Sequence, residues 1–580
     1  MHFEQKFEAT TFEITAMDEN IFKRFDEVAA GESGRALWAA RAPYRPESGF
    51  DLMLIPRLPK GTDWREDAAA LEALDRIEAE PWVESVDREG RQPTVRLADE
   101  WIEAQGEAIR SGARGDEQFA DMAAGNRYAV YFWGANTTKA LHIGHLRNLA
   151  VGAAIAGALK QAGGRVENRS LICDVGRSMG EAMAGVATRA GEDAGPDADE
   201  KSDHFVGFCY ADYVTASRNG GLGDDGAEDS VARESTQYDD KADEMMMRVL
   251  GGDQKALELW SKTRSWVISG QRKTLARLGI AFDKVIFESD FLPEVAEFTN
   301  QGLAAGTLTK RWGDDMVMYE TEREELEEMP LVRSDGLPTQ HMRALAYWAA
   351  ADELDDVISM QVCGNEWVAH VTCRRKLIDE LGLSNGNGYG SARGGGPPTY
   401  DIFHGMVARE NESISSSKKG ALLIDELVEW LEEELKGNEE LAREMEGHPH
   451  PETLPAQIAL GYFLLQPTTK QVNFGKERLL REGKGSLGWD LARAQAHHAS
   501  AEIEGERPAA DADYRFAVVQ SEHYRVHLRS AVEEFDVAPL SKYLSHFARW
   551  YSEEERAPEV EAVVQPVLEQ GLRGLGLEGV

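Results

Sequence analysis

The chain has few cysteines and no long apolar stretch. Its 580 residues include four cysteines, none in a Cys-x-x-Cys pair, which argues against a disulfide framework and against a structural zinc site. There is no run of about 18 apolar residues, the minimum for a typical transmembrane helix. The first residues, MHFEQKFEATTFEIT, lack the basic and apolar regions of a signal peptide. We therefore expect a cytoplasmic protein that does not bind a membrane.

Positive charge is also scarce. The formal net charge is −39, whereas a nucleic-acid-binding protein usually offers Lys and Arg to the phosphates. A chain adapted to a very salty cytoplasm also carries excess Asp and Glu, because about 1 M salt screens their charge within a few ångströms. We interpret the charge as a mark of habitat that says little about the partner.

Patterns along the chain predict three successive units. Residues 1 to about 115 form a small N-terminal unit that ends in a polar linker, residues 116–450 alternate strand and helix patterns, and residues 451–580 follow a helical pattern. The predicted fold is α/β, with a Rossmann-like parallel-sheet catalytic domain that carries an insertion at about 190–310. We expect an all-α helical bundle after this domain and a small domain before it.

Several segments carry these expectations. RYAVYFW and VENRSLICDVG read as parallel strands on either side of the helix LRNLAVGAAIAGALKQAGG. The acidic tract GDDGAEDSVARESTQYDDKADE is expected to be a solvated loop or face, and SNGNGYGSARGGGPP a flexible loop. In APLSKYLSHFARWY, apolar residues recur at helical spacing and predict one buried face.

Two histidines, His142 and His145, flank Gly144 where the first strand gives way to the helix. Zinc would need three or four ligands, and no third is nearby, so we predict no metal site. A helix start whose histidines merely pack is a second interpretation. The position favours a third, because a helix N-terminus points N–H groups at the ligand crevice of a parallel sheet and glycine permits close approach. Two imidazoles there could stabilise a phosphate in the transition state.

The stretch HIGH, at 142–145, resembles the signature of class I aminoacyl-tRNA synthetases, and its surroundings narrow the resemblance. NTTKALHIGHLRN is similar to the arginyl-tRNA synthetase version. Further similar segments are DVGRSMG, with Asp174, Gly176 and Gly180, then SDG at 334–336 with Arg343 after it, HGMV at 404–407, and the C-terminal helices, which resemble an anticodon-binding bundle. The resemblance spans roughly residues 120–580.

The resemblance implies an arginine–tRNA ligase, usually monomeric, that adenylates arginine with ATP and Mg²⁺ and transfers it to tRNA. It makes His142, His145, Lys139 and Lys418 catalytic. The implied nucleotide contacts are Gly144, Ser415, Ser416, Met406 and Val407, and the implied substrate contacts are Asn136, Asp174 and Gln340. The N-terminal unit stands where this family often carries a domain that touches tRNA.

The chain departs from the family in two places. The second signature loop is SISSSKKG, in which Ser413 takes the place of the first lysine, and Lys139 is the candidate to replace its charge. Tyr131 stands where the family has a glutamate that holds the substrate, and Gln340 and Ala344 stand at two further substrate positions. An arginine guanidinium prefers a carboxylate partner.

Three hypotheses therefore remain. The first is an arginine–tRNA ligase. The second is a paralogue that activates a different amino acid or transfers it to a non-ribosomal acceptor. Glu366, in GNEWVAH, is a candidate to compensate for the lost carboxylates and would favour the first. The third is a non-catalytic RNA-binding or regulatory descendant, which the intact HIGH stretch and Lys139 disfavour.

Overall fold

The computed structural model describes most of the chain. The described residues are 20–578, except 32–33, 114, 192–194, 220–236, 324–325, 352–353, 355–356, 384–398, 410–411, 414–421, 481–485 and 501–510. The glycine-rich segment expected to be a flexible loop and most of the second signature loop lie outside them. Among the described helices, none combines the length and apolarity that a membrane crossing needs.

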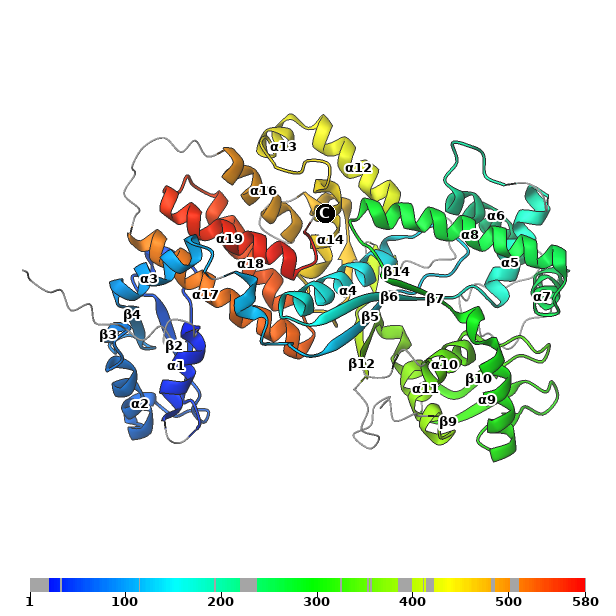
Figure 1. Cartoon of the computed structure of the whole chain (residues 1–580), viewed down its shortest axis with the longest axis horizontal. Coiled ribbons are helices and arrows are strands. Elements are labelled where there is room, and N and C mark those ends of the chain that lie inside the picture. The colour runs from blue at the N-terminus through cyan, green and yellow to red at the C-terminus, as the bar shows by residue number, and fades with distance from the viewer. Residues whose placement is uncertain are drawn as a thin grey trace, which may run out of the picture.

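The N-terminal unit is built on a four-stranded antiparallel sheet of order β1-β2-β4-β3. It lies at one end of the molecule, in blue in Figure 1, beside the C-terminal helix α17 (Asp511–Glu534). Its elements are α1 (Ile21–Ala30), β1 (Trp38–Arg41), β2 (Leu52–Pro56), α2 (Ala68–Glu78), β3 (Val83–Asp87), β4 (Thr94–Leu97) and α3 (Asp99–Arg110).

The central sheet has five parallel strands in the order β12-β11-β5-β6-β7. Its strands are β5 (Arg127–Trp133), β6 (Arg165–Ile172), β7 (Lys284–Phe287), β11 (Ile358–Gly364) and β12 (Thr399–His404). The predicted parallel α/β domain is thus confirmed. From β5 the chain builds outward through β6 and β7, and later returns to the other side as β11 and β12. The strand order therefore reverses between β5 and β11, where such sheets bind ligands.

Helix α4 (Ile143–Gln161) follows β5 and is buried on almost every side. It packs between the sheet and the C-terminal helices, which is why its sequence is rich in Ala and Gly. A Cβ on Gly157 would come within 2.5 Å of the backbone nitrogen of Gly576. The small residues of this helix therefore allow the two domains to pack backbone against backbone.

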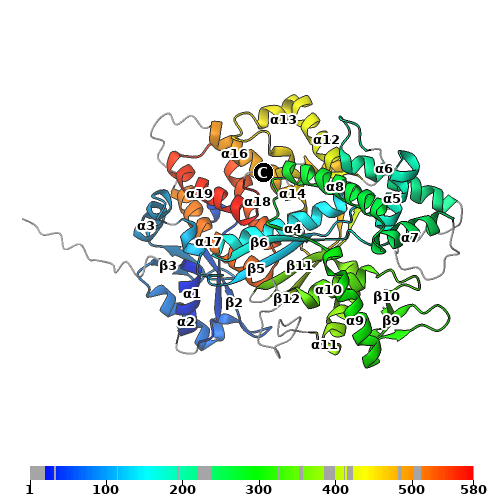
Figure 2. The same cartoon turned by 45° about the vertical axis from the view of Figure 1, so that its right-hand side comes forward.

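The insertion is helical. It comprises α6 (Ser202–Asn219), α7 (Gln237–Leu250) and α8 (Gln254–Arg277), after α5 (Arg177–Arg189). The chain rejoins the central sheet at β7, within the range expected for the insertion. The end of the acidic tract forms the start of α7 rather than a loop, because Ala242, Met245 and Met246 give that helix a buried face. Figure 2 shows α5 to α8 above the green α9 to α11 region.

The remaining elements of the middle region flank the sheet. A second antiparallel sheet joins β8 (Thr309–Lys310), β9 (Val317–Arg323) and β10 (Leu326–Val332). The helices are α9 (Leu292–Ala305), α10 (Gln340–Ala350), α11 (Val368–Glu380), α12 (Ile424–Gly437) and α13 (Glu439–Glu444).

The C-terminal region is mostly helical. Its helices are α14 (Leu454–Leu464), α15 (Lys476–Leu479), α16 (Leu487–Ser500), α17, α18 (Ala538–Ser552) and α19 (Pro558–Gly574). The apolar face predicted for α18 is buried as expected, from Leu540 to Tyr551. The expectation of helix throughout was wrong at β15 (Val472–Phe474), which pairs with β13 (Val407–Arg409) beside β14 (Glu412–Ser413). A partner strand 60 or so residues away in sequence decides this conformation, not local pattern.

The N-terminal unit and α17 share a buried polar interface. Arg515 is almost fully buried and pairs with Asp51 of the N-terminal sheet, Nε to Oδ1 at 3.1 Å. Close by, the His523 ring packs on Phe22 of α1 at 4.8 Å between centroids, and His527 stacks on Tyr543 at 4.9 Å. Burial lowers the pKa of His523 to about 3 and that of His527 to about 4.

We predict that acid weakens this interface. The unfolded histidines protonate below about pH 6.5, while the folded ones stay neutral until pH 4 to 3, so the free energy of unfolding falls as the pH drops through that window. Between pH 7 and pH 5 the loss should be on the order of 2 kcal/mol for each histidine, and so on the order of 4 kcal/mol for the pair. Urea unfolding at fixed salt should show a smaller loss for the double variant His523→Gln/His527→Gln. An identical loss in both proteins would contradict the prediction.

Candidate active site

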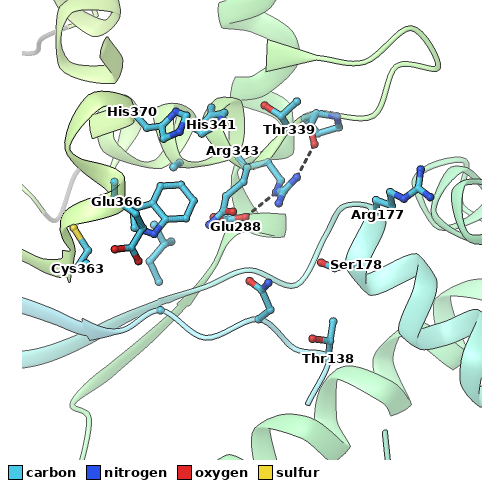
Figure 3. Close-up of a pocket in the computed structure, with 18 of the residues that line it drawn as sticks. Thr138, Arg177, Ser178, Glu288, Thr339, His341, Arg343, Cys363, Glu366 and His370 are labelled. Atoms are coloured by element: carbon cyan, nitrogen blue, oxygen red, sulfur yellow. Dashed lines mark hydrogen bonds and ion pairs between the residues drawn. The ribbon is translucent and has the colours of Figure 1, made fainter. Parts of the chain in front are cut away.

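A cavity of about 950 Å³ opens at the carboxyl ends of β5 and β11, at the point where the strand order reverses. Its walls come from the β5–α4 connection, the starts of α5 and α10, the face of α6, the β11–α11 connection and the segment after β12. Figure 3 shows several of these side chains converging from separate elements. Of the predicted contacts, Asn136, Lys139, His142, Gly144, His145, Gln340, Met406 and Val407 line this cavity.

His142 and His145 both accept hydrogen bonds from backbone N–H groups at the start of α4. The Gly144 N–H donates to His142 Nδ1 at 3.1 Å, and the His142 N–H donates to His145 Nδ1 at 3.1 Å. The pair caps α4 reciprocally, with ring centroids 3.9 Å apart. Since both Nδ1 atoms accept, the ring proton of each neutral imidazole sits on Nε2. Each ring can therefore donate one hydrogen bond without carrying a charge.

The surroundings keep both rings neutral. Burial, with a smaller effect of the Lys139 cation, lowers the pKa of His142 to about 3. Burial, His142 and Lys139 together hold the pKa of His145 well below its usual range. Gly144 has a structural part in this arrangement, because a Cβ there would lie 2.9 Å from His142 Cε1. The glycine makes room for the folded-back imidazole, a requirement that sequence reasoning did not identify.

Arg147 and Asn148, further along the first turns of α4, fix the opposite wall of the cavity. Arg147 is fully buried and donates to the carbonyl oxygens of Gly405 at 2.8 Å and Thr468 at 2.9 Å. Asn148 donates to the Phe132 carbonyl oxygen at 2.7 Å, and its amide oxygen lies 3.0 Å from His404 Nε2. These bonds position the segment that carries Met406 and Val407 against the start of α4.

The start of α4 is also bonded to the chain just after the second signature loop. The Ile143 N–H donates to the Leu422 carbonyl oxygen at 3.1 Å, and the Ile424 N–H donates to the Leu141 carbonyl oxygen at 3.0 Å. Residues on both sides of His142 are thus paired with residues 422–424. Residues 422–424 are therefore held directly beside the histidine pair.

Asp425, the following residue, connects three helices. Its carboxylate accepts from Lys201 Nζ at 2.8 Å and from Thr274 Oγ1 at 3.1 Å, and it lies 3.2 Å from His204 Nε2. Burial alone would raise its pKa, but the hydrogen bonds from His204 and Lys201 hold the pKa of Asp425 well below its usual range. The start of α12 is therefore tied to the insertion helices α6 and α8.

The other end of the cavity is formed around Tyr131. Its hydroxyl lies 2.5 Å from the Tyr347 hydroxyl and accepts from Arg169 at 3.1 Å. Arg343, the arginine after SDG, is buried and donates to Glu288 Oε2 at 2.7 Å and to the Pro338 carbonyl oxygen at 2.6 Å, as the dashed lines in Figure 3 mark. Arg343 and Glu288 therefore balance each other's charge within the protein.

Asp174 does not line the cavity, although it was an expected substrate contact. It is fully buried and accepts from Arg264 at 2.9 Å and from the Ser289 hydroxyl at 2.7 Å. The DVGRSMG motif alone could not predict these partners, because Arg264 and Ser289 both lie more than 80 residues away in sequence. Ser415, Ser416 and Lys418 lie outside the described residues and stay predictions.

Many lining residues had no role assigned from motifs, Trp348 and Arg374 among them, whereas Glu366 was a candidate to compensate for the lost carboxylates. Glu366 faces the cavity just past β11, and burial raises its pKa although its own backbone N–H acts in the opposite sense. Its position just beyond the end of a parallel strand is what brings this candidate to the cavity. Trp348 and Arg374 lie within helices, where sequence gives no such signal.

Most carboxylates that line the described part of the cavity are paired with arginines instead of being available to a metal ion. Among the described residues, five lining acids are each paired with an arginine, and no group of three or more His, Cys, Asp or Glu has the arrangement of a metal site. The pairs are Glu181–Arg177, Asp243–Arg333, Glu288–Arg343, Asp314–Arg311 and Asp335–Arg333. A Mg²⁺ ion here would depend on nucleotide phosphates for its ligands, which is its usual mode.

Comparison with known proteins gives sequence relatives of one kind. The arginine–tRNA ligase of Borrelia duttonii is 27% identical over 366 residues, which is 60% of this chain and 57% of that protein. The arginine–tRNA ligase of Treponema denticola is 30% identical over 355 residues, 60% of this chain and 55% of that protein. These matches span less than two thirds of the relatives' own length. No protein-family model matches the chain.

Solved structures of the same kind share the fold. The arginyl-tRNA synthetase of Thermus thermophilus has a TM-score of 0.67 at 19% identity and covers 96% of this chain and 99% of its own. That of Plasmodium falciparum has a TM-score of 0.64 at 15% identity, with 96% and 98% covered. The chain thus has an arginyl-tRNA synthetase fold, and its sequence is similar to arginine–tRNA ligases, consistent with a class I arginyl-tRNA synthetase-like protein.

We predict that His142 and His145 stay neutral, with the proton on Nε2, from pH 8 down to pH 5. Burial lowers the pKa of His142 to about 3 and holds the pKa of His145 well below its usual range, so neither ring is expected to titrate near pH 6.5. Imidazole ¹⁵N spectra assigned with His142→Asn and His145→Asn should show two signals of this tautomer that do not shift over the range. A titration with a midpoint near pH 6.5 would contradict the geometry.

Proposed function

We propose that this protein activates an amino acid with ATP and Mg²⁺ as an aminoacyl-adenylate and transfers the aminoacyl group to tRNA. The observation that carries the proposal is the neutral histidine pair, which presents two Nε2–H donors at the start of a buried helix where the sheet's strand order reverses. Enzymes of this kind need positioning and charge stabilisation more than covalent chemistry.

The adenylation step follows from this geometry. An oxygen of the substrate carboxylate attacks the α-phosphorus, the bond to the bridging oxygen of the β-phosphate breaks, and pyrophosphate leaves with the electron pair. His142 and His145 donate to the α-phosphate oxygens as their charge increases. Lys139, beside them in the cavity, balances the charge of the leaving pyrophosphate. Met406 and Val407 offer an apolar surface for the adenine, and Lys418 remains a further candidate for the phosphates.

Arginine is the amino acid in the names of the relatives, and it is the first substrate to test. A second candidate function, the same chemistry with another amino acid, is favoured by one observation. Tyr131 and Gln340, both neutral, line the cavity where the family resemblance calls for substrate-binding groups.

ATP–pyrophosphate exchange with each of the twenty amino acids, with and without tRNA and at high salt, tests the proposal. We expect exchange with at least one amino acid, followed by formation of aminoacyl-tRNA. Absence of exchange with every amino acid would reject the function and favour a non-catalytic descendant.

Replacing Lys139 by alanine should lower the rate of exchange by about 10²-fold, the scale observed when one charge-stabilising donor is removed. Lys160→Ala, at the exposed far end of α4, is the matched control and should leave the rate unchanged. Near-normal exchange by Lys139→Ala would refute the role of this lysine.

Trp312 supports a nucleic-acid acceptor. It is 99% exposed and lies between Arg311 and Asp314, both of which line the cavity. Unpaired bases stack on such side chains with about 1–3 kcal/mol each. Trp312→Ala should therefore raise the KM for tRNA about tenfold and leave the KM for ATP unchanged in steady-state aminoacylation. An unchanged KM for tRNA would remove Trp312 from the acceptor site.

A further inference from the structure

The inference concerns the tRNA of the proposed function and rests on that function. Helix α8 is basic within an acidic chain, because its 24 residues include six Lys and Arg but a single acid, Glu258. Its formal charge of +5 compares with +2 or less for every other helix in the described part of the chain. Two of these cations have carboxylate partners, since Arg264 pairs with Asp174, and Arg277 binds the acids of α12. The charge of the helix surface therefore depends on the other four.

The four remaining cations all lie on the exposed side of α8, and together they are called the basic face here. They are Lys255, Lys262, Arg272 and Lys273. None of them forms an ion pair with a residue that the structure describes. Asp253, just before α8, instead pairs with Arg248 at 2.8 Å. Glu429 of α12 lies 3.4 Å from Arg277. The basic face is therefore not neutralised by the described part of the chain.

The spacing of the basic face fits a long anion. At a rise of about 1.5 Å per residue, Lys255 and Lys262 lie roughly 10 Å apart along the helix axis, and Lys262 and Arg272 roughly 15 Å apart. A free phosphate or a single nucleotide cannot contact cations over that length. The backbone of a nucleic acid can, because it carries a phosphate charge every few ångströms. The basic face therefore fits a polyanion and not a small metabolite.

The buried side of α8 supports the wall of the cavity. Gln271 donates to the Lys139 carbonyl oxygen at 2.8 Å and accepts from the Trp133 indole N–H at 3.1 Å. Thr274 donates to Asp425, at the start of α12, at 3.1 Å. Figures 1 and 2 both show α8 as a long green helix that runs from α12 to α7. The basic face thus lies about one helix diameter, roughly 10–12 Å, from the β5–α4 connection.

We propose that the basic face of α8 binds the phosphate backbone of tRNA outside the cavity. The four cations pair with phosphates, and the exposed hydroxyl groups of Ser265 and Ser269 donate to phosphate oxygens between them. A chain with a net charge of −39 repels RNA over most of its surface, so a local positive surface decides where the backbone is held. Contacts of this kind persist in salt better than long-range attraction, because the paired charges lie within a few ångströms of each other.

The test measures binding of unfractionated tRNA to the full chain, over the range of salt in which circular dichroism shows every variant to be folded. The triple variant Lys262→Gln/Arg272→Gln/Lys273→Gln should raise the Kd at least tenfold. It should also lower the slope of log Kd against log salt by about 2 to 3, because each lost phosphate contact removes about one unit. An unchanged Kd and slope would overturn the inference.

A matched control makes the same change in net charge at the opposite edge of the central sheet. Arg127 and Arg165 are exposed at the amino ends of β5 and β6, and Lys160 is exposed at the far end of α4. The triple variant Arg127→Gln/Lys160→Gln/Arg165→Gln should leave the affinity for tRNA unchanged. Equal effects of the two triple variants would attribute the loss to net charge and overturn the inference.

Conservative variants separate charge from folding. Lys262→Arg/Arg272→Lys/Lys273→Arg keeps the three charges and should bind tRNA with the affinity of the unaltered chain. If the glutamine triple variant fails to fold, its three single substitutions keep the inference testable, since each removes one exposed cation and should lower the salt slope by about 1. A change in the mass of the particle with unchanged tRNA affinity would assign the face to a protein partner and overturn the inference.

Steady-state aminoacylation supplies a second readout. The glutamine triple variant should raise the KM for tRNA about tenfold or more and leave the KM for ATP unchanged, because α8 offers its cations outside the cavity. An equal rise in both KM values would show damage to the cavity and overturn the inference. Binding of tRNA is measured without catalysis, so its failure is distinct from that of the proposed function, which absence of exchange with every amino acid would reject.

Discussion

The buried guanidinium of Arg147 is the interaction on which the rest of the site depends. It lies one turn into α4 and bonds to backbone carbonyl oxygens of Gly405 and Thr468, far apart in sequence. Burial lowers its pKa to about 10, so it remains charged at neutral pH. Hydrogen bonds to a charged group contribute roughly 1.5–3 kcal/mol each, and an unpaired buried cation would be very costly. This geometry therefore commits the catalytic sheet, the segment after β12 and the C-terminal helices to one mutual position.

Backbone hydrogen bonds also couple the segment around His142 to the chain just after the second signature loop. The residues around His142 pair with residues 422–424, and Asp425 then bonds to Lys201 and Thr274 of the insertion. The start of α12 is thus fixed both to the start of α4 and to the insertion helices. The histidine pair and residues 422–424 are thus held together, although more than 250 residues separate them in sequence.

Sequence reasoning succeeded where the determinants are local. The unit β5–α4–β6 follows from strand propensity, a helix pattern and glycines, and the histidine pair follows from its place at the strand's end. It failed where residues that are distant in sequence determine the local structure. The strand β15 exists because β13 is beside it, and Asp174 lies outside the cavity because Arg264 and Ser289 engage its carboxylate. The contact of Arg374 with Gln361 could not be predicted at all, since the two residues come from separate elements and meet only in the folded chain.

The extreme negative charge of the chain and the proposed binding of a nucleotide are reconciled by local pairing. A net charge of −39 would repel a nucleotide if it reached the cavity unscreened. Inside the cavity, however, five acids are paired with four arginines, two of them with Arg333, and the histidine pair is neutral, so the net charge around Lys139 is small. Coulomb energy depends on the charges within a few ångströms once salt screens the others. The charges that a ligand in the cavity meets are therefore those of a few nearby side chains, within a protein that carries dozens.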